Sequence, residues 1–207
     1  MNILPKQNEA LFFHENLVTK VFLDPKIIRQ RLERTRFLSD IPEIISEGEY
    51  FYTYKFCDGL PLSRARSVES YFIVLNNAYK KMWCDRTVDH EKAAIFCNKF
   101  YIEKTYQRLE QFCLTREYKD SECIINGQMC REVKFLLSMI DKKKLSQSLW
   151  LSDFHGDFHS ENIIFEPKQQ KITLLDWRES FAGSIDLGDA HYDLAKFKHG
   201  LIVSHDP

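Results

Sequence analysis

The chain has 207 residues, a hydrophobic fraction of 44% and a formal net charge of −1. This length is enough to bury a hydrophobic core, and the balanced charge argues against a disordered chain and against a general nucleic-acid-binding protein. Glycine is scarce, with seven in all, and the first is Gly48. A function that needs a glycine-rich loop near the N-terminus is therefore disfavoured.

Cysteine spacing and hydropathy indicate the cellular setting. The six cysteines contain no CxxC pair, which argues against a zinc ribbon or a thioredoxin-type site. We expect small buried or half-buried thiols in a reducing compartment. The N-terminus lacks the apolar core of a signal peptide, and no uninterrupted apolar stretch is long enough to span a bilayer. The sequence thus predicts a cytoplasmic protein with neither a membrane nor a nucleic acid as partner.

The first 57 residues are rich in predicted strands, expected over 10–14, 17–23 and twice within 43–57. Asp24 and Pro25 are typical of the N-cap and first position of a helix, which we expect to end near residues 38–40. The apolar stripe of this helix is predicted to be Ile28, Leu32 and Thr35. Too few residues precede Ala10 for a full first strand and loop.

The remainder, residues 58–207, is predicted to be mainly helical. Helices are expected over 69–83, 91–114, 130–144 and 186–203, with a polar loop at 115–130. Short strands return between 149 and 176. We therefore predict an α+β fold with two lobes, a strand-rich N-lobe over residues 1–57 and a larger helical C-lobe over 58–207.

The densest chemistry lies in the segment His155-Gly156-Asp157-Phe158-His159-Ser160-Glu161-Asn162. Two apolar strands joined by a polar turn follow it, and Asp176 ends the second strand. Because a hairpin folds back, Asn162 and Asp176 can lie side by side. A carboxylate and an amide oxygen suit Mg²⁺, which takes waters and phosphate oxygens as its other ligands. Asp157 can then accept or orient a hydroxyl proton, as in phosphoryl transfer.

This segment resembles the catalytic core of the aminoglycoside phosphotransferase and choline kinase-like family, which has a protein-kinase-like fold. The family reads H-G-D-x-H-x-x-N, and every fixed position is present here. Asp176-Trp177-Arg178 keeps the metal-binding Asp of the family's second motif and lacks its glycine. The stretch from Gly188 to Ala195 resembles the start of a family helix, G-D-x-x-x-D-L-A.

The resemblance implies a small-molecule kinase that transfers the terminal phosphate of ATP, with Mg²⁺, to a hydroxyl group. Asp157 is the expected base, and Asn162 and Asp176 are the expected metal ligands. His155 and His159 would shape the loop, and Asp193 would hold it by hydrogen bonds. The acceptor is left open among a sugar, an aminoglycoside, an amino alcohol and a glycan precursor. Arg178 and Glu179, just past the metal ligand, are candidate acceptor contacts.

The N-lobe residues fit the same resemblance. Lys20 lies within an apolar strand, and a charge there needs a partner. In this fold a strand lysine contacts the nucleotide phosphates and pairs with a helix glutamate, which predicts a pair between Lys20 and Glu33. The backbone of Lys55 and Cys57 would pair with the nucleotide base. The phosphate-covering loop would be residues 4–9, which contain no glycine.

Two other interpretations remain open. The missing glycine loop and the altered second motif fit a catalytically inactive kinase-like module that only binds nucleotide. Alternatively, His155, Asp157 and His159 could form a transition-metal site in a zinc hydrolase, although Asn162 and Asp176 would then have no role. The sequence leaves the oligomeric state undefined.

Overall fold

A computed structural model describes residues 2–5, 8–65 and 67–202. Its contacts divide the chain into two compact units, Met1–Arg86 with Trp150–Pro207, and Thr87–Leu149. The first unit holds a strand-rich N-terminal sheet and helices, so the predicted mixed α and β fold class is confirmed. The predicted boundary after residue 57 falls inside this unit and stays a prediction.

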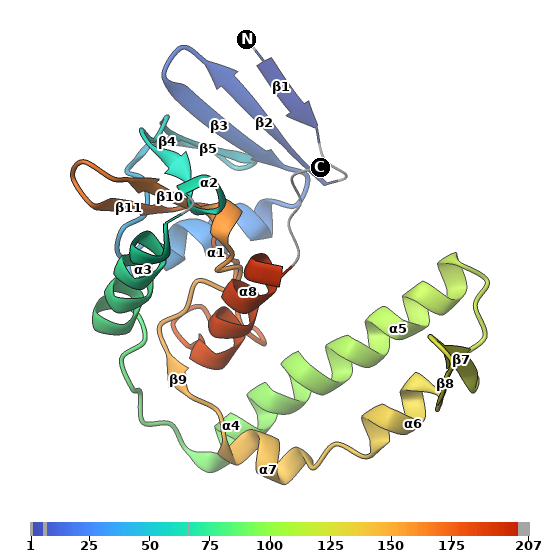
Figure 1. The fold of residues 1–207 in the computed structure, drawn as a ribbon. Coiled ribbons are helices and arrows are strands. Elements are labelled where there is room, and N and C mark those ends of the chain that lie inside the picture. The colour runs from blue at the N-terminus through green and yellow to red at the C-terminus, as the bar shows by residue number, and fades with distance from the viewer. Residues whose placement is uncertain (1, 6–7, 66, 203–207) are drawn as a thin grey trace. The chain divides into compact units, whose positions relative to one another are not determined.

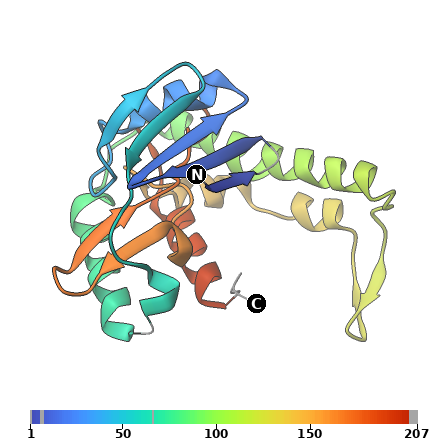
Figure 2. The ribbon, with the colours of Figure 1, turned by 90° about the horizontal axis from the view of Figure 1, so that it is seen from above.

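The N-terminal part of the first unit is a five-stranded antiparallel sheet in the order β1-β2-β3-β5-β4 (Figures 1 and 2). Its strands are β1 (Asn2–Pro5), β2 (Glu9–His14), β3 (Leu17–Phe22), β4 (Ile44–Glu47) and β5 (Phe51–Lys55). Too few residues were expected before Ala10 for a full first strand and loop, but a four-residue strand lies there, because β1 pairs with β2 from Asn2 opposite Phe13 to Pro5 opposite Ala10. Lys6 and Gln7, in the predicted phosphate-covering loop, lie outside the described residues.

Helix α1 (Pro25–Arg34) follows β3 and begins as predicted, with the Asp24 carboxylate accepting from the backbone N of Lys26 at 2.8 Å. Its buried residues are Ile28, Arg31 and Arg34. Of the other two residues of the predicted stripe, Leu32 is partly buried and packs against the core, and Thr35 is the C-cap. The helix is also shorter than predicted, because the chain after Arg34 changes to turns closed by hydrogen bonds three residues back.

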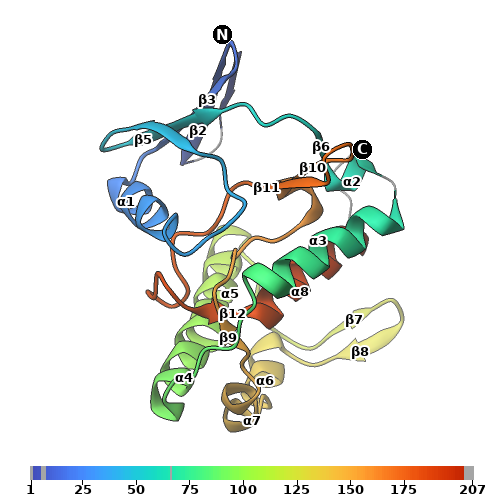
Figure 3. The same cartoon turned by 90° about the vertical axis from the view of Figure 1, so that its left-hand side faces the viewer.

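The rest of the first unit contains two small sheets, β11-β10-β6 and β12-β9, together with helices (Figure 3). Its helices are α2 (Leu62–Ala65), α3 (Val68–Lys81) and α8 (Ala190–Ile202). Its strands are β6 (Leu60–Pro61), β9 (Leu151–Ser152), β10 (Ile163–Glu166), β11 (Lys171–Leu174) and β12 (Gly188–Asp189). Residue 203, the predicted end of α8, lies outside the described residues.

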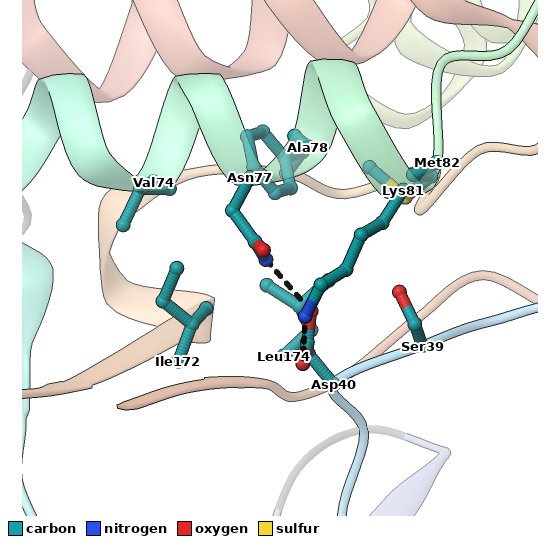
Figure 4. A pocket seen from close by; sticks show the side chains of 10 residues that line it. Ser39, Asp40, Val74, Asn77, Ala78, Lys81, Met82, Ile172 and Leu174 are labelled. Carbon is teal, nitrogen blue, oxygen red and sulfur yellow. Dashed lines mark hydrogen bonds and ion pairs between the residues drawn. The ribbon is translucent and has the colours of Figure 1, made fainter. Parts of the chain in front are cut away.

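One hydrophobic core joins the N-terminal sheet to the β10–β11 hairpin and to helices α3 and α8. Tyr52 of β5, for example, stacks on Trp177 with 5.7 Å between the ring centroids. Asp40, which follows α1, links that part of the chain to α3. Its carboxylate accepts hydrogen bonds from Asn77 at 2.7 Å and from Lys81 at 3.0 Å (Figure 4). These contacts fix where the functional side chains of the first unit lie.

The second unit is mainly helical. It contains α4 (His90–Cys97), a π-helical segment (Asn98–Glu103), α5 (Lys104–Thr115), β7 (Cys123–Ile125), β8 (Gln128–Cys130), α6 (Val133–Ser138) and α7 (Lys142–Gln147). The predicted loop at 115–130 therefore contains a hairpin. The predicted helix at 130–144 is interrupted, since the Asp141 carboxylate caps a new helix by accepting from the Lys144 N at 2.9 Å.

All six cysteines are free thiols. Among the described residues, no helix has both the length and the apolar character needed to cross a membrane.

Candidate active site

The loop from His155 to Asn162, which carries most of the candidate catalytic residues, connects β9 to β10. Asp193 of α8 holds the backbone of this loop. The Asp193 carboxylate, fully buried, accepts from the backbone N of His155 and of Gly156, both at 2.7 Å, and from Trp83 Nε1 at 3.3 Å. Burial raises the pKa of Asp193 to about 6, although these donors oppose the rise. Asp193 therefore holds the backbone of the loop at His155 and Gly156.

The two motif glycines are required by close packing. Gly156 has a φ of +88°, and a Cβ there would lie 2.5 Å from the Cβ of Arg178. A Cβ on Gly188 would lie 2.3 Å from the ring of Phe154. A side chain at Gly156 would therefore collide with Arg178, and one at Gly188 would collide with Phe154. Both positions need glycine for this close packing.

His155 supports the loop from inside. Its ring is fully buried, and its Nδ1 accepts from the backbone N of Asp157 at 3.2 Å. Burial lowers the pKa of His155 to about 3, so the imidazole is neutral at pH 7. A neutral ring with an acceptor nitrogen fixes the backbone of Asp157 without adding charge beside it.

The Asp157 carboxylate has different neighbours on its two oxygens. Oδ2 accepts from Asn162 Nδ2 at 3.1 Å and lies 3.5 Å from His159 Nε2. Oδ1 lies 2.8 Å from Lys196 Nζ on α8. Partial burial favours the neutral acid, but hydrogen bonds from His159 and Lys196 outweigh it and hold the pKa of Asp157 below its usual range. Asp157 is therefore ionised, and its side chain keeps 32% of its surface exposed.

His159 lies between two acids. Its Nδ1 is 2.8 Å from Glu161 Oε2, and its Nε2 is 3.1 Å from Asn162 Nδ2. The hydrogen bond to Asp157 raises the pKa of His159, with burial opposing the rise. The structure thus brings Asp157, His159 and Asn162 together.

Asp176 occupies the far end of the hairpin, where the backbone adopts a φ of 61°. The backbone N of Leu175 donates to the Asn162 carbonyl at 2.8 Å, so the segments that carry Asn162 and Asp176 lie side by side. The Asp176 Oδ1 accepts from Lys20 Nζ and, at 2.7 Å, from Arg31 Nη1. Burial favours the neutral acid, but these two cations hold the pKa of Asp176 well below its usual range.

Lys20 is 3% exposed, and its ion-pair partners are Asp176 and Glu9 Oε2, the latter at 3.8 Å. The predicted pairing with Glu33 is thus replaced by a pairing with the hairpin acid. Residues two apart on a helix do not share a face, and Arg31 is the residue of α1 that faces Asp176. Burial lowers the pKa of Lys20, opposed mainly by Asp176.

Arg34 fastens the α1 helix to the loop. Its guanidinium donates to the carbonyls of Phe154 and Arg178, and to the Ile185 carbonyl at 3.1 Å. It also lies 3.9 Å from the centroid of the Phe154 ring. Sequence reasoning missed Arg31, Arg34 and Lys196, although the spacing of Ile28, Arg31 and Arg34 is itself a helical stripe.

The remaining predicted residues are more peripheral. Lys55 ends β5 and is exposed, and Cys57 is half-buried with its thiol 3.5 Å from the Lys55 carbonyl. Both line a cavity of about 480 Å³ beside the β10–β11 hairpin. Arg178 lies with its guanidinium carbon 5.7 Å from the centroid of the Tyr192 ring, and Glu179 is half-buried.

The donor set of Asn162 and Asp176 fits Mg²⁺. No cluster of three or more His, Cys, Asp or Glu suited to a metal occurs within the described ranges. Magnesium is usually held through one or two carboxylates, with waters and phosphate oxygens as its other ligands. Asp176 would supply the one carboxylate that magnesium needs, and Asn162, on the neighbouring segment, would supply an amide oxygen.

Comparison with known proteins agrees with this geometry. Residues 131–201 match the phosphotransferase enzyme family. The predicted resemblance is thereby confirmed over the stretch that carries Asp157, Asn162, Asp176 and Asp193. No curated protein matches the chain in sequence.

Two solved structures share the fold over nearly the whole chain. The aminoglycoside phosphotransferase APH(3'')-Id from Streptomyces rimosus is 16% identical, with a TM-score of 0.55, and the match covers 97% of this chain and 77% of that one. An ethanolamine kinase from Plasmodium vivax is 15% identical, with a TM-score of 0.53, and the match covers 96% of this chain and 60% of that one. The protein-kinase-like fold is therefore confirmed, and this chain spans less than two thirds of the ethanolamine kinase.

Proposed function

We propose that the chain is a phosphotransferase that moves the terminal phosphate of ATP, with Mg²⁺, to a hydroxyl group of a small molecule. The observation that carries the proposal is the grouping of an ionised Asp157 with Asn162 on one loop, beside a hairpin acid, Asp176, that Lys20 contacts. The named relatives act in the same chemical class, since one is an aminoglycoside phosphotransferase and the other an ethanolamine kinase.

Asp157 has the features of a base that orients a hydroxyl. It is ionised, partly exposed and fixed by the ring of His155 and the amide of Asn162. The acceptor oxygen would bond to phosphorus as the bond from phosphorus to the leaving ADP breaks, and Asp157 would take the hydroxyl proton. Because its pKa lies below the usual range, Asp157 acts mainly by orienting the hydroxyl and takes the proton late in the transfer.

Asn162 and Asp176 would hold the magnesium ion, which supplies positive charge to the phosphate oxygens when bound. Lys20 places a second positive charge next to Asp176. The backbone of Lys55 and Cys57 would receive the nucleotide base, and Arg178 and Glu179 would contact the acceptor. Catalysis then rests on positioning and on neutralising charge. The six free thiols accord with the proposed cytoplasmic setting.

The test is a screen of hydroxyl compounds with ATP and Mg²⁺, with ADP release as the readout. Asp157→Asn and Asp176→Ala should each lower turnover at least about 100-fold, the scale of general acid–base catalysis. Asp85→Asn, an exposed acid outside the site, should leave turnover unchanged. Full activity of either site variant would refute the proposal. Metal-dependent ATP binding without turnover on any acceptor would indicate the inactive module instead.

A further inference from the structure

Helix α8 presents a cation to the side of Asp157 that faces away from Asn162. Asn162 Nδ2 bonds to Oδ2, whereas Lys196 Nζ lies 2.8 Å from Oδ1. The two contacts use different oxygens, so Lys196 lies on the opposite edge of the carboxylate from the proposed magnesium ligand. A hydroxyl acceptor that reaches Asp157 on this edge must come next to the Lys196 ammonium.

A second cation lies on the same face of α8. Tyr192 is one helical turn before Lys196, and residues four apart on a helix are neighbours. The Arg178 guanidinium lies over the Tyr192 ring. Of the nearby acids, Glu161 is bonded to His159 and Glu179 interacts with the buried Arg34. Lys196 and Arg178 therefore place two cations along this face of α8.

Charge balance limits what the acceptor can be. The Lys196 side chain keeps 33% of its surface exposed, and its ammonium lies 2.8 Å from Asp157 Oδ1. An acceptor hydroxyl that bonds to Asp157 Oδ1 competes with the Lys196 ammonium for this oxygen and displaces it in part. A cationic acceptor would also be repelled by Lys196, whereas an anionic group would replace the interaction that Lys196 gives up.

We propose that the acceptor carries an anionic group, a carboxylate or a phosphate, close to the hydroxyl that is phosphorylated, and that Lys196 binds this group. The inference rests on the proposed function and specifies its substrate class. It sets this chain apart from the named relatives, because aminoglycosides and ethanolamine carry amines that are protonated at neutral pH.

The test compares hydroxyl compounds that share a skeleton and differ in charge. One series is glucose 6-phosphate, glucose and glucosamine, and the other is glycerate, glycerol and 3-aminopropane-1,2-diol. Binding of each probe to the full chain is measured by calorimetry, and ADP release is measured in parallel. In both series we expect the anionic member to bind at least about ten-fold more tightly than the cationic one, the scale of one charge-assisted hydrogen bond.

Three variants assign this preference to Lys196. Lys196→Gln should abolish it, and Lys196→Arg should retain most of it. Lys198→Gln, which removes the same charge from an exposed position of the same helix, should leave it unchanged. Melting curves for each variant check that the protein is folded.

The outcomes separate this inference from the proposed function. Equal or tighter binding of the cationic members, or an anionic preference that survives Lys196→Gln, overturns the inference even if the enzyme is active. An equal loss of ATP affinity in Lys196→Gln would also overturn it by assigning Lys196 to the nucleotide. Charge-dependent binding through Lys196 without any phosphoryl transfer would overturn the proposed function and retain the anion site.

Discussion

The ion cluster around Asp176 gives the most direct test of the structure. Asp176→Asn keeps the shape of the side chain and removes the charge that Lys20 and Arg31 share. Lys20 is 3% exposed, so its ammonium cannot turn to water. Removing one partner from a buried ion pair costs about 3–5 kcal/mol. The free energy of unfolding should fall by that amount.

The assay is thermal unfolding at pH 7 followed by circular dichroism. For a chain of 207 residues, each kcal/mol corresponds to roughly 2–4 °C, so the Tm of Asp176→Asn should fall by roughly 6–20 °C. The matched control, Asp85→Asn at an exposed position, should change stability by less than about 0.5 kcal/mol.

A double variant tests the cause of this loss. Lys20→Met combined with Asp176→Asn removes one of the two buried cations that lose Asp176 as a partner, so the double variant should be more stable than Asp176→Asn by at least about 1 kcal/mol. A Tm of Asp176→Asn equal to that of the control would refute the argument from a buried ion cluster. Further destabilisation in the double variant would show that the uncompensated ammonium is not its cause.

Three further predictions concern the support of the loop. Gly188→Ala should destabilise by about 1–3 kcal/mol because its Cβ meets Phe154; an unchanged urea midpoint would contradict this packing. Arg34→Lys should lower turnover more than ATP affinity, since one ammonium cannot serve the several carbonyls that the guanidinium reaches; equal loss of both would indicate general unfolding. Burial lowers the pKa of His155 to about 3, so as the pH falls below 6.5 the unfolded state binds a proton that the native state excludes, and stability is lost. Asp193, with a raised pKa of about 6, acts in the opposite direction between 6 and 4. Tm measured from pH 7 to 4 should therefore fall less steeply in His155→Gln than in the wild type, and parallel curves would disprove this assignment.

The loop motif was predictable because its residues are close in sequence. Asp157, His159 and Asn162 lie within one short segment, and the hairpin returns the chain to Asn162 through a regular register. Local spacing and turn chemistry were therefore sufficient to place them together. The same holds for the cap at Asp24, where the helix begins as predicted.

The partners of the buried cations were not predictable in this way. Arg31 bonds to a residue 145 positions away and Arg34 to carbonyls more than 100 positions away. On a helix, an arginine whose partners are distant looks like a surface residue, so an apolar stripe was predicted through Leu32 and Thr35. The buried face of α1 contains Arg31 and Arg34. Their charges are tolerated there because the oxygens that accept their hydrogen bonds come from the C-terminal part of the chain.

A lysine from a different part of the fold contacts each candidate acid, and His159 also helps to keep Asp157 ionised. The two arrangements differ in access. Asp176 has two cations, Lys20 and Arg31, and little exposed surface, so its position is fixed before any ligand arrives. Asp157 is more exposed and has Lys196 on a single oxygen. A rigid acid suits a group that holds a metal, whereas an accessible acid with one replaceable cation suits a group that must receive a hydroxyl. The difference between these two lysine contacts is the physical reason for assigning binding to Asp176 and acceptor orientation to Asp157.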